Sequence, residues 1–203
     1  MIFFLVFGVS IGISIGLANI GFSQQLNNIL DAGLGFSMPV SVLLYFILYK
    51  KFNLKEILNQ LGLRRSGLSP KMIGIGLLIF LVIFLLDLAV SLVSSVLHTQ
   101  INTNIGVLLG GSPLWFYIFA AVIEPINEEV LFRGFAVPRL GIVISALVFG
   151  LLHAGYNSTF GVEIIAAFIF GIIAGYAFKK TKSLYPPIIA HILVNSIAVI
   201  ALL

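Results

Sequence analysis

Acidic, imidazole and amide side chains recur in the second half of this chain, inside segments that are otherwise apolar. They fall in three short motifs, EEVLFR at 128–133, FGLLH at 149–153 and HILVN at 191–195. An ionisable side chain is costly within lipid, and such residues in membrane helices mark functional sites. Together, the three motifs indicate hydrolytic chemistry carried out within a bilayer.

The first motif contains two adjacent glutamates, Glu128 and Glu129, whose neighbours along the helix differ. Glu124 and Glu128 are four residues apart and share a helix face, beside an expected kink at Pro125. Glu129 lies four residues before Arg133, which is the favourable orientation for an ion pair. We therefore expect Arg133 to hold Glu129 ionised as an orienting group. Glu128, which has no dedicated cation, is the expected base.

The other two motifs supply His153, His191 and Asn195 at similar depths. At 1.5 Å per residue, Glu128 lies roughly 12–15 Å, His153 roughly 18 Å, His191 roughly 10 Å and Asn195 roughly 15 Å from the basic turns. We therefore expect the four side chains to converge on one cavity. A purely structural role, as hydrogen bonds between helices, is the alternative.

A mechanism follows from these residue types. Glu128, assisted by His153, would deprotonate a water molecule that attacks a peptide carbonyl, and His191 and Asn195 would donate hydrogen bonds to the oxyanion. This chemistry needs no cofactor. Zinc is a minority alternative, because Glu and His can ligate it, but the chain has no His-Glu-x-x-His sequence.

The composition predicts an integral membrane protein. The 203 residues are 60% hydrophobic and 9% charged, with a mean hydropathy of +1.18, whereas soluble domains carry about 25% charged residues. We expect a single membrane domain over 1–203, with the catalytic motifs within 113–203. The net charge of +4 comes without a basic surface interleaved with aromatic residues, so a nucleic-acid partner is not expected.

The apolar runs predict an all-α bundle of about seven membrane spans. The expected spans are 2–22, 34–49, 72–97, 113–135, 141–154, 162–178 and 185–203. The first run has no basic n-region and no clear cleavage site, so we expect a retained helix. An amphipathic segment at 51–71, with a helix that ends near Gly62, is expected on the cytoplasmic surface. Glycines on one face, at 8, 12 and 16 and at 171 and 175, indicate close helix packing.

The basic residues predict the orientation. All eleven fall in connectors on the same side as the N-terminus of the seven-span arrangement: Lys50, Lys51, Lys55, Arg64, Arg65, Lys71, Arg133, Arg139, Lys179, Lys180 and Lys182. Basic residues beside membrane helices favour the cytoplasm. The N-terminus is therefore expected to be cytoplasmic, the C-terminus outside, and the site open to the cytoplasmic side.

The three motifs, in this order, resemble those of the CAAX protease and bacteriocin-processing (abortive-infection) family. The pattern is met at Glu128, Glu129, Arg133, Phe149, His153, His191 and Asn195, and the resemblance covers about 113–203. The type II CAAX prenyl endopeptidases of this family imply an intramembrane peptide-bond hydrolase. The resemblance implies that Glu128 and His153 activate water, that His191 and Asn195 form the oxyanion hole, and that catalysis depends on glutamate rather than on a metal.

The resemblance implies membrane lipid and a peptide or protein substrate as partners, and the substrate can itself carry a lipid. The oligomeric state is left open. One alternative is a non-catalytic membrane protein, such as a bacteriocin-immunity or assembly factor. A third hypothesis is a transporter with a proton relay through Asp87, Glu124 and Glu128.

Overall fold

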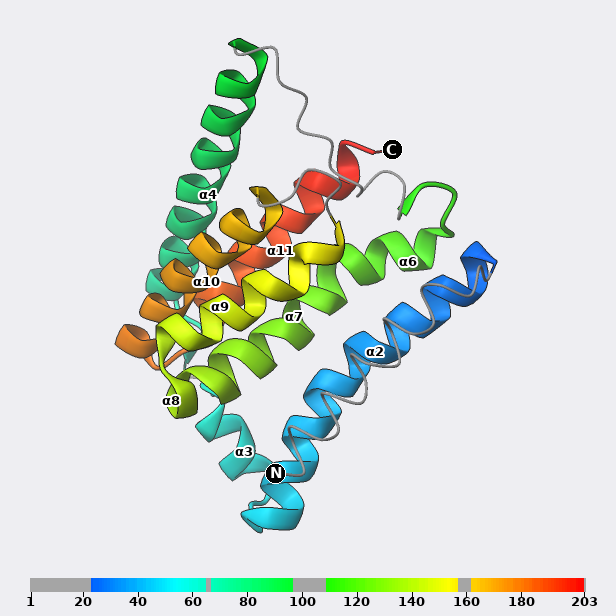
Figure 1. Cartoon of the computed structure of the whole chain (residues 1–203). Coiled ribbons are helices and arrows are strands. Elements are labelled where there is room, and N and C mark those ends of the chain that lie inside the picture. The colour runs from blue at the N-terminus through cyan, green and yellow to red at the C-terminus, as the bar shows by residue number, and fades with distance from the viewer. Residues whose placement is uncertain (1–22, 65–66, 97–108, 157–161, 203) are drawn as a thin grey trace.

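The computed structural model describes residues 23–64, 67–96, 109–156 and 162–202, and it shows helices and no strand within these ranges (Figure 1). This confirms the all-helical class. The expected first span at 2–22, its retention as a helix and its glycines at 8, 12 and 16 lie outside the described residues.

The described elements follow one another as helices and short irregular helical segments. They are α2 (Gln24–Leu44), η1 (Tyr45–Tyr49), α3 (Leu54–Gln60), α4 (Pro70–Val96), α6 (Leu114–Ile118), η3 (Phe119–Ile123), α7 (Glu124–Glu129), η4 (Val130–Ala136), α8 (Val137–Leu140), α9 (Ile142–Leu152), η5 (His153–Tyr156), α10 (Val162–Thr181) and α11 (Tyr185–Ile200). The segments η1, η3 and η4 are π-helical, and η5 is a 3-10 turn.

Three helical stretches among the described residues are long and apolar enough to cross a membrane: Gln24–Tyr49, Pro70–Val96 and Val162–Thr181. The apolar helices α9 and α11 are shorter. The chain is therefore an integral membrane helical protein, and the total of seven spans stays a prediction.

The predicted start of the second span, at residue 34, is wrong, because α2 begins ten residues earlier at Gln24. The segment before residue 34 carries polar side chains, among them Ser23, Gln24 and Asn28. The Ser23 hydroxyl caps the helix by accepting a hydrogen bond from the Leu26 N–H at 3.4 Å. The Gln24 amide also donates to Asn28 at 3.1 Å, one helical turn away.

Other predicted ends shift by a few residues. The helical stretch expected to end at 135 continues through α8 to Leu140, where Gly141 with φ of 82° ends it. The α-helix α9 stops at Leu152, so His153 lies in the following 3-10 turn. Helix α11 ends at Ile200 rather than at 203.

The amphipathic segment forms α3, as predicted. Asn53 and Glu56 make a reciprocal capping box at the start of the helix. Ile57 and Leu61 are buried in the core, and Gly62 follows with φ of 75°. The helix therefore ends at the glycine expected to stop it.

Two close helix pairs support the site. Helix α11 packs on α4, and α9 packs on α10 (Figure 1). A Cβ atom on Gly171 would lie 2.8 Å from the Cβ of Ala146, and one on Gly175 would lie 3.0 Å from Ile142. The predicted close packing at Gly171 and Gly175 is therefore confirmed. Helix α11 also contacts α7, which brings the first and third motifs together.

Candidate active site

The first motif lies on a helix that alternates between α and π geometry. The segments η3 and η4 lie on either side of α7, which carries Glu124, Glu128 and Glu129. A π-helical turn holds more residues than an α turn, so it rotates the following side chains about the axis. Such segments occur frequently at functional sites.

The predicted ion pair between Glu129 and Arg133 is confirmed. Oε1 of Glu129 lies 2.7 Å from Nη1 of Arg133, and both side chains are almost wholly buried, with exposures of 0% and 1%. Two opposite charges inside the protein are stable there only when they are paired and hydrogen-bonded. The pair therefore fixes the position of both side chains.

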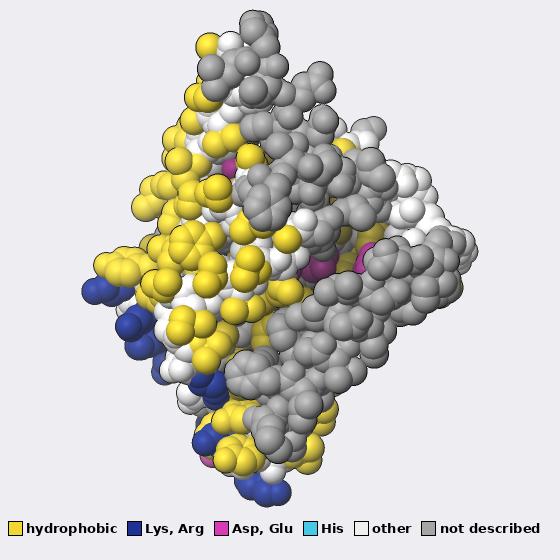
Figure 2. All heavy atoms as spheres, viewed as in Figure 1, with side chains coloured by type: hydrophobic (Ala, Val, Ile, Leu, Met, Phe, Trp, Pro, Cys, Tyr) yellow, Lys and Arg dark blue, Asp and Glu magenta, His cyan; other side chains and the backbone are white. Residues whose placement is uncertain are grey.

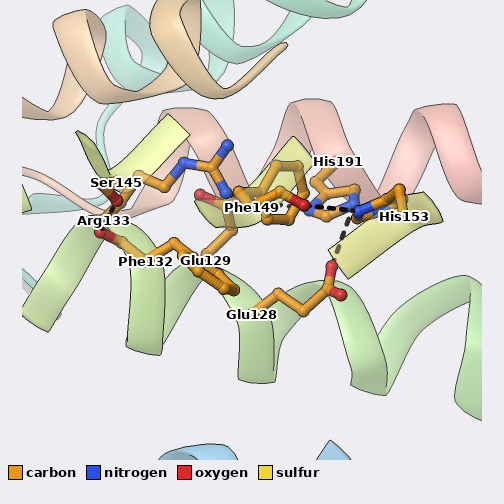
Figure 3. A network of polar contacts seen from close by, with 8 residues as sticks. All are labelled: Glu128, Glu129, Phe132, Arg133, Ser145, Phe149, His153 and His191. Carbon is orange, nitrogen blue, oxygen red and sulfur yellow. Dashed lines mark hydrogen bonds and ion pairs between the residues drawn. The ribbon is translucent and has the colours of Figure 1, made fainter. Parts of the chain in front are cut away.

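His191 joins both glutamates of the first motif. Its Nδ1 lies 2.9 Å from Oε1 of Glu129, and its Nε2 lies 3.5 Å from Oε2 of Glu128 (Figure 3). An ionised carboxylate can only accept a hydrogen bond, so Nδ1 is the donor to Glu129. The other ring nitrogen therefore faces Glu128.

The 3.5 Å contact between Glu128 and His191 is compatible with two arrangements of one proton on this pair. Either Glu128 is protonated beside a neutral imidazole, or Glu128 is a carboxylate beside an imidazolium. In both states the cluster of Glu128, Glu129, Arg133 and His191 has no net charge, which is the arrangement that burial favours. In the second state Glu128 is a base and Nε2 of His191 is a hydrogen-bond donor.

His153 is held by the backbone of the second motif. Its Nδ1 donates to the Phe149 carbonyl at 2.9 Å, because a carbonyl can only accept. In the neutral ring, Nε2 then carries the lone pair. Figure 3 shows the Glu128 carboxylate pointing toward the two histidines, so the structure brings Glu128, His153 and His191 together.

Two phenylalanines enclose the charged groups. The guanidinium carbon of Arg133 lies 4.3 Å from the ring centre of Phe149 and 5.0 Å from that of Phe170. The Phe170 ring also lies 4.7 Å from the His191 ring. Aromatic faces attract cations, and this attraction is strongest away from water. Phe170 was not predicted, since nothing in its sequence distinguishes it from the other phenylalanines of its span.

Ser145 is a second residue that the motifs missed. Its hydroxyl donates to the Phe132 carbonyl at 2.9 Å and so ties α9 to η4 (Figure 3). The sequence did hold a signal, because Ser145 is the single polar side chain in the apolar helix Ile142–Leu152.

Asn195 binds the backbone of η3. Its Nδ2 donates to the Ala120 carbonyl at 3.1 Å. Pro125, five residues after Ala120, has no N–H to offer in the π-helical register. Asn195 therefore satisfies a carbonyl that the helix cannot. The Asn195 amide nitrogen carries two N–H groups, and this hydrogen bond uses one of them. The predicted oxyanion role requires the second N–H, and that role stays a prediction.

The acids of the predicted proton relay lie on two helices, Glu124 and Glu128 on α7 and Asp87 on α4, and the relay stays a prediction. Glu124 of α7 interacts with the charges of Asp31 on α2 and of Glu128. Asp87 of α4 instead interacts with Glu163 of α10. In the described part of the chain, no group of three His, Cys, Asp or Glu side chains is arranged to hold a metal ion.

The segment that carries the three motifs is similar to a known protein family. A family model described as "Type II CAAX prenyl endopeptidase Rce1-like" matches residues 110–197. Over these residues the chain is similar to this family. The resemblance that the motifs predicted is therefore confirmed, and the Rce1-like segment includes all six predicted site residues. An endopeptidase family supports a peptide hydrolase.

A curated relative matches more weakly. The uncharacterized protein YpbD of Bacillus subtilis (strain 168) is 29% identical over 80 residues, which are 39% of this chain and 42% of YpbD. The match thus spans less than half the length of either protein. No solved structure matches the chain significantly.

Proposed function

We propose that this protein is an integral membrane endopeptidase that hydrolyses a peptide bond with water activated by Glu128. One observation carries the proposal. Within the Rce1-like segment, two glutamates, an arginine and a histidine form one buried cluster that is joined by contacts of 2.7, 2.9 and 3.5 Å. A scaffold gains little stability from such a cluster, because well-packed apolar residues serve as well or better.

The proposed reaction begins with Glu128 as a carboxylate and His191 as an imidazolium. Glu128 takes a proton from water while the oxygen attacks the carbonyl carbon of the substrate, with the lone pair of His153 orienting that water. The C=O bond becomes a C–O⁻ single bond, which accepts hydrogen bonds from His191 Nε2 and Asn195. When the C–N bond breaks, Glu128 returns the proton to the leaving nitrogen, and the products are an amine and a carboxylic acid, which then loses its own proton to solvent.

Glu129 and Arg133 act as positioning residues in this reaction. Glu129 holds Nδ1 of His191, so that Nε2 is directed toward Glu128 and the substrate. Arg133 balances the charge of Glu129 and packs between two rings. This arrangement resembles the way a carboxylate orients histidine in a catalytic triad.

The substrate is proposed to be a peptide or protein held at the membrane by a lipid or by a hydrophobic segment, with a prenylated peptide as the first candidate. The site is proposed to open on the side of the basic residues, the cytoplasmic side. No cofactor is invoked, and zinc dependence is the alternative that a chelator would reveal.

The test uses the full chain in detergent with a farnesylated peptide and a library of unmodified membrane peptides. Glu128→Gln keeps the size of the side chain and removes the base, so it should lower turnover by about 10²–10⁴-fold. Glu163→Gln, at the start of α10, is the matched control and should retain activity. Equal turnover by wild type and Glu128→Gln would overturn the proposal, and no turnover by any protein would favour the non-catalytic alternative. Loss of activity only on chelation would favour zinc.

A further inference from the structure

A cavity of about 270 Å³ lies where the loop after α3 meets the connection between α10 and α11. Its walls include Gly62, Arg64, Ser69, Thr181, Lys182 and Ser183. The proposed reaction uses none of these residues.

Hydrogen bonds between the two loops hold the walls of the cavity together. The Leu184 N–H donates to the Gly62 carbonyl at 3.0 Å, and the Ser183 hydroxyl donates to the Gly67 carbonyl at 3.3 Å. A Cβ atom on Gly62 would lie 2.8 Å from the Lys182 carbonyl oxygen, so the two loops approach too closely for a side chain there. The walls are thus tied together by the fold.

The lining is basic and rich in hydroxyl groups. Arg64 and Lys182 contribute positive charge, and neither makes an ion pair among the described residues. Ser69 adds a hydroxyl, whereas the Thr181 hydroxyl already donates to the Ala177 carbonyl at 2.8 Å, and none of the described residues that line the cavity is acidic. A guanidinium fork, an ammonium group and hydroxyl donors are the groups that bind phosphate oxygens.

Lys182 occupies an unfavourable backbone conformation. Its φ is 54°, in the left-handed region, where a side chain has an energetic cost and glycine has none. Strained residues of this kind cluster at ligand clamps. Lys182 directly follows the end of α10, where its N–H donates to the Phe178 carbonyl at 2.8 Å, so its backbone is held at the wall of the cavity while its side chain is exposed.

The position of the cavity at the ends of two candidate membrane spans favours a lipid headgroup as its ligand. Ser69 precedes Pro70, where one candidate membrane span begins, and Thr181 ends another. The cavity therefore lies at the boundary of the apolar region, the level of lipid headgroups. Figure 2 shows Lys and Arg side chains gathered at one end of a broad hydrophobic face. Basic pockets between membrane helices at this level bind anionic headgroups.

We propose that Arg64 and Lys182 bind the phosphate of an anionic phospholipid headgroup in this cavity. The ligand chemistry is a phosphate oxyanion, and a free phosphate ion is the competing source of it. This inference is independent of the peptidase proposal.

The test measures binding to the full-length protein in neutral detergent by the rise in Tm on titration with phosphatidylglycerol. Wild type should respond to phosphatidylglycerol and not to phosphatidylcholine. Arg64→Gln/Lys182→Gln should bind at least about tenfold more weakly. Lys50→Gln/Lys55→Gln removes the same charge outside the cavity and should bind as wild type does. Inorganic phosphate alone should produce no comparable shift at millimolar concentration.

The Lys182→Gly variant tests whether weaker lipid binding is caused by a folding defect. It removes the ammonium group and relieves the strained backbone, so its Tm without lipid should equal or exceed that of wild type while its response to phosphatidylglycerol falls. Equal binding by wild type and Arg64→Gln/Lys182→Gln would overturn the proposal. A loss as large in Lys50→Gln/Lys55→Gln would show general surface attraction, and a full shift with inorganic phosphate would show a free-phosphate site. Either result would also overturn it.

Discussion

At the scale of single residues, one carboxylate oxygen takes part both in the buried ion pair and in orienting a proposed catalytic histidine. Oε1 of Glu129 accepts hydrogen bonds from both Arg133 and His191. Among the described residues, Oε2 of Glu129 and Nη2 of Arg133 have no hydrogen-bond partner. The ion pair thus has one contact instead of the two that this pair of groups can make. Glu129 therefore binds Arg133 and His191 through the same oxygen, Oε1, and its ion pair with Arg133 has a single contact.

Removing Arg133 should therefore be more harmful than removing the whole pair. Arg133→Met leaves the Glu129 carboxylate buried without its cation and should lower the free energy of unfolding by about 3–5 kcal/mol. Glu129→Gln/Arg133→Met should recover much of this loss, because neither side chain is charged. Its turnover should stay low, since a neutral amide in place of the carboxylate no longer favours the imidazolium form of His191. Unfolding in detergent and peptide hydrolysis measure the two effects.

A matched control for this experiment is Arg139→Met. Arg139 is exposed, packs 3.9 Å from the Phe135 ring centre and donates to a backbone carbonyl, so its loss should cost about 1 kcal/mol. The interpretation of the buried pair fails if Arg133→Met is no less stable than Arg139→Met.

At the scale of helical elements, a proline and an asparagine both act on one backbone carbonyl of the helix that carries the first motif. Pro125 leaves the Ala120 carbonyl without a helical donor, and Asn195 of α11 supplies one. The HILVN motif thus has a structural reason for its asparagine in addition to the proposed oxyanion role. The two roles can be separated, because they depend on different partners.

Asn195→Ala should leave the Ala120 carbonyl unsatisfied and lower stability by about 1–3 kcal/mol. Pro125→Ala restores a backbone N–H near that carbonyl, so Pro125→Ala/Asn195→Ala should regain most of the stability. Thermal unfolding measures this recovery, and turnover of the stable double variant then reports the oxyanion role. Turnover equal to that of Pro125→Ala alone would limit Asn195 to the structural role.

The contact between α9 and α10 sets the spacing of the aromatic rings around Arg133. Gly171 lies next to Phe170, and a Cβ atom there would meet that of Ala146 at 2.8 Å. Gly171→Ala should push the helices apart, cost about 1–3 kcal/mol by overpacking and reduce turnover. Gly74→Ala is the control, because nothing lies within 4 Å of its Cβ position. Alanine there should leave stability equal or higher, and equal effects at both positions would contradict the packing account.

Helices and the main ion pair could be predicted from the sequence because both depend on local spacing. Glu129 and Arg133 are four residues apart, and the apolar runs are long. The π-helical segment η3 could not be predicted, because its Ala120 carbonyl finds a donor 75 residues away on Asn195. Phe170 acquires its partners only when α10 packs against α9 and α11. The catalytic roles of the six motif residues stay predictions.

At the scale of the whole molecule, charge and hydropathy divide the surface. Helix α4 exposes a succession of large apolar side chains, among them Leu78, Leu85 and Leu92, which matches a helix in contact with lipid. The amphipathic helix α3 and the turn at α8 lie together at one end of the bundle (Figure 1). Apart from the buried Arg133, the basic residues of the described chain lie in or beside α3, the start of α4, α8 and the connection between α10 and α11, which predicts that this end faces the cytoplasm.

The absence of cysteine from the chain makes this orientation directly measurable, because each introduced thiol is unique. Lys55→Cys and Lys180→Cys mark the basic end, and Val96→Cys, where 77% of the side chain is exposed, marks the far end of α4. In intact cells a membrane-impermeant maleimide should label Val96→Cys and leave the other two unmodified, whereas inside-out vesicles should show the reverse. Since the charge bias orients all spans together, both basic-end variants must agree. Labelling of Lys55→Cys and Lys180→Cys from outside the cell would invert the topology and place the peptidase site on the opposite face.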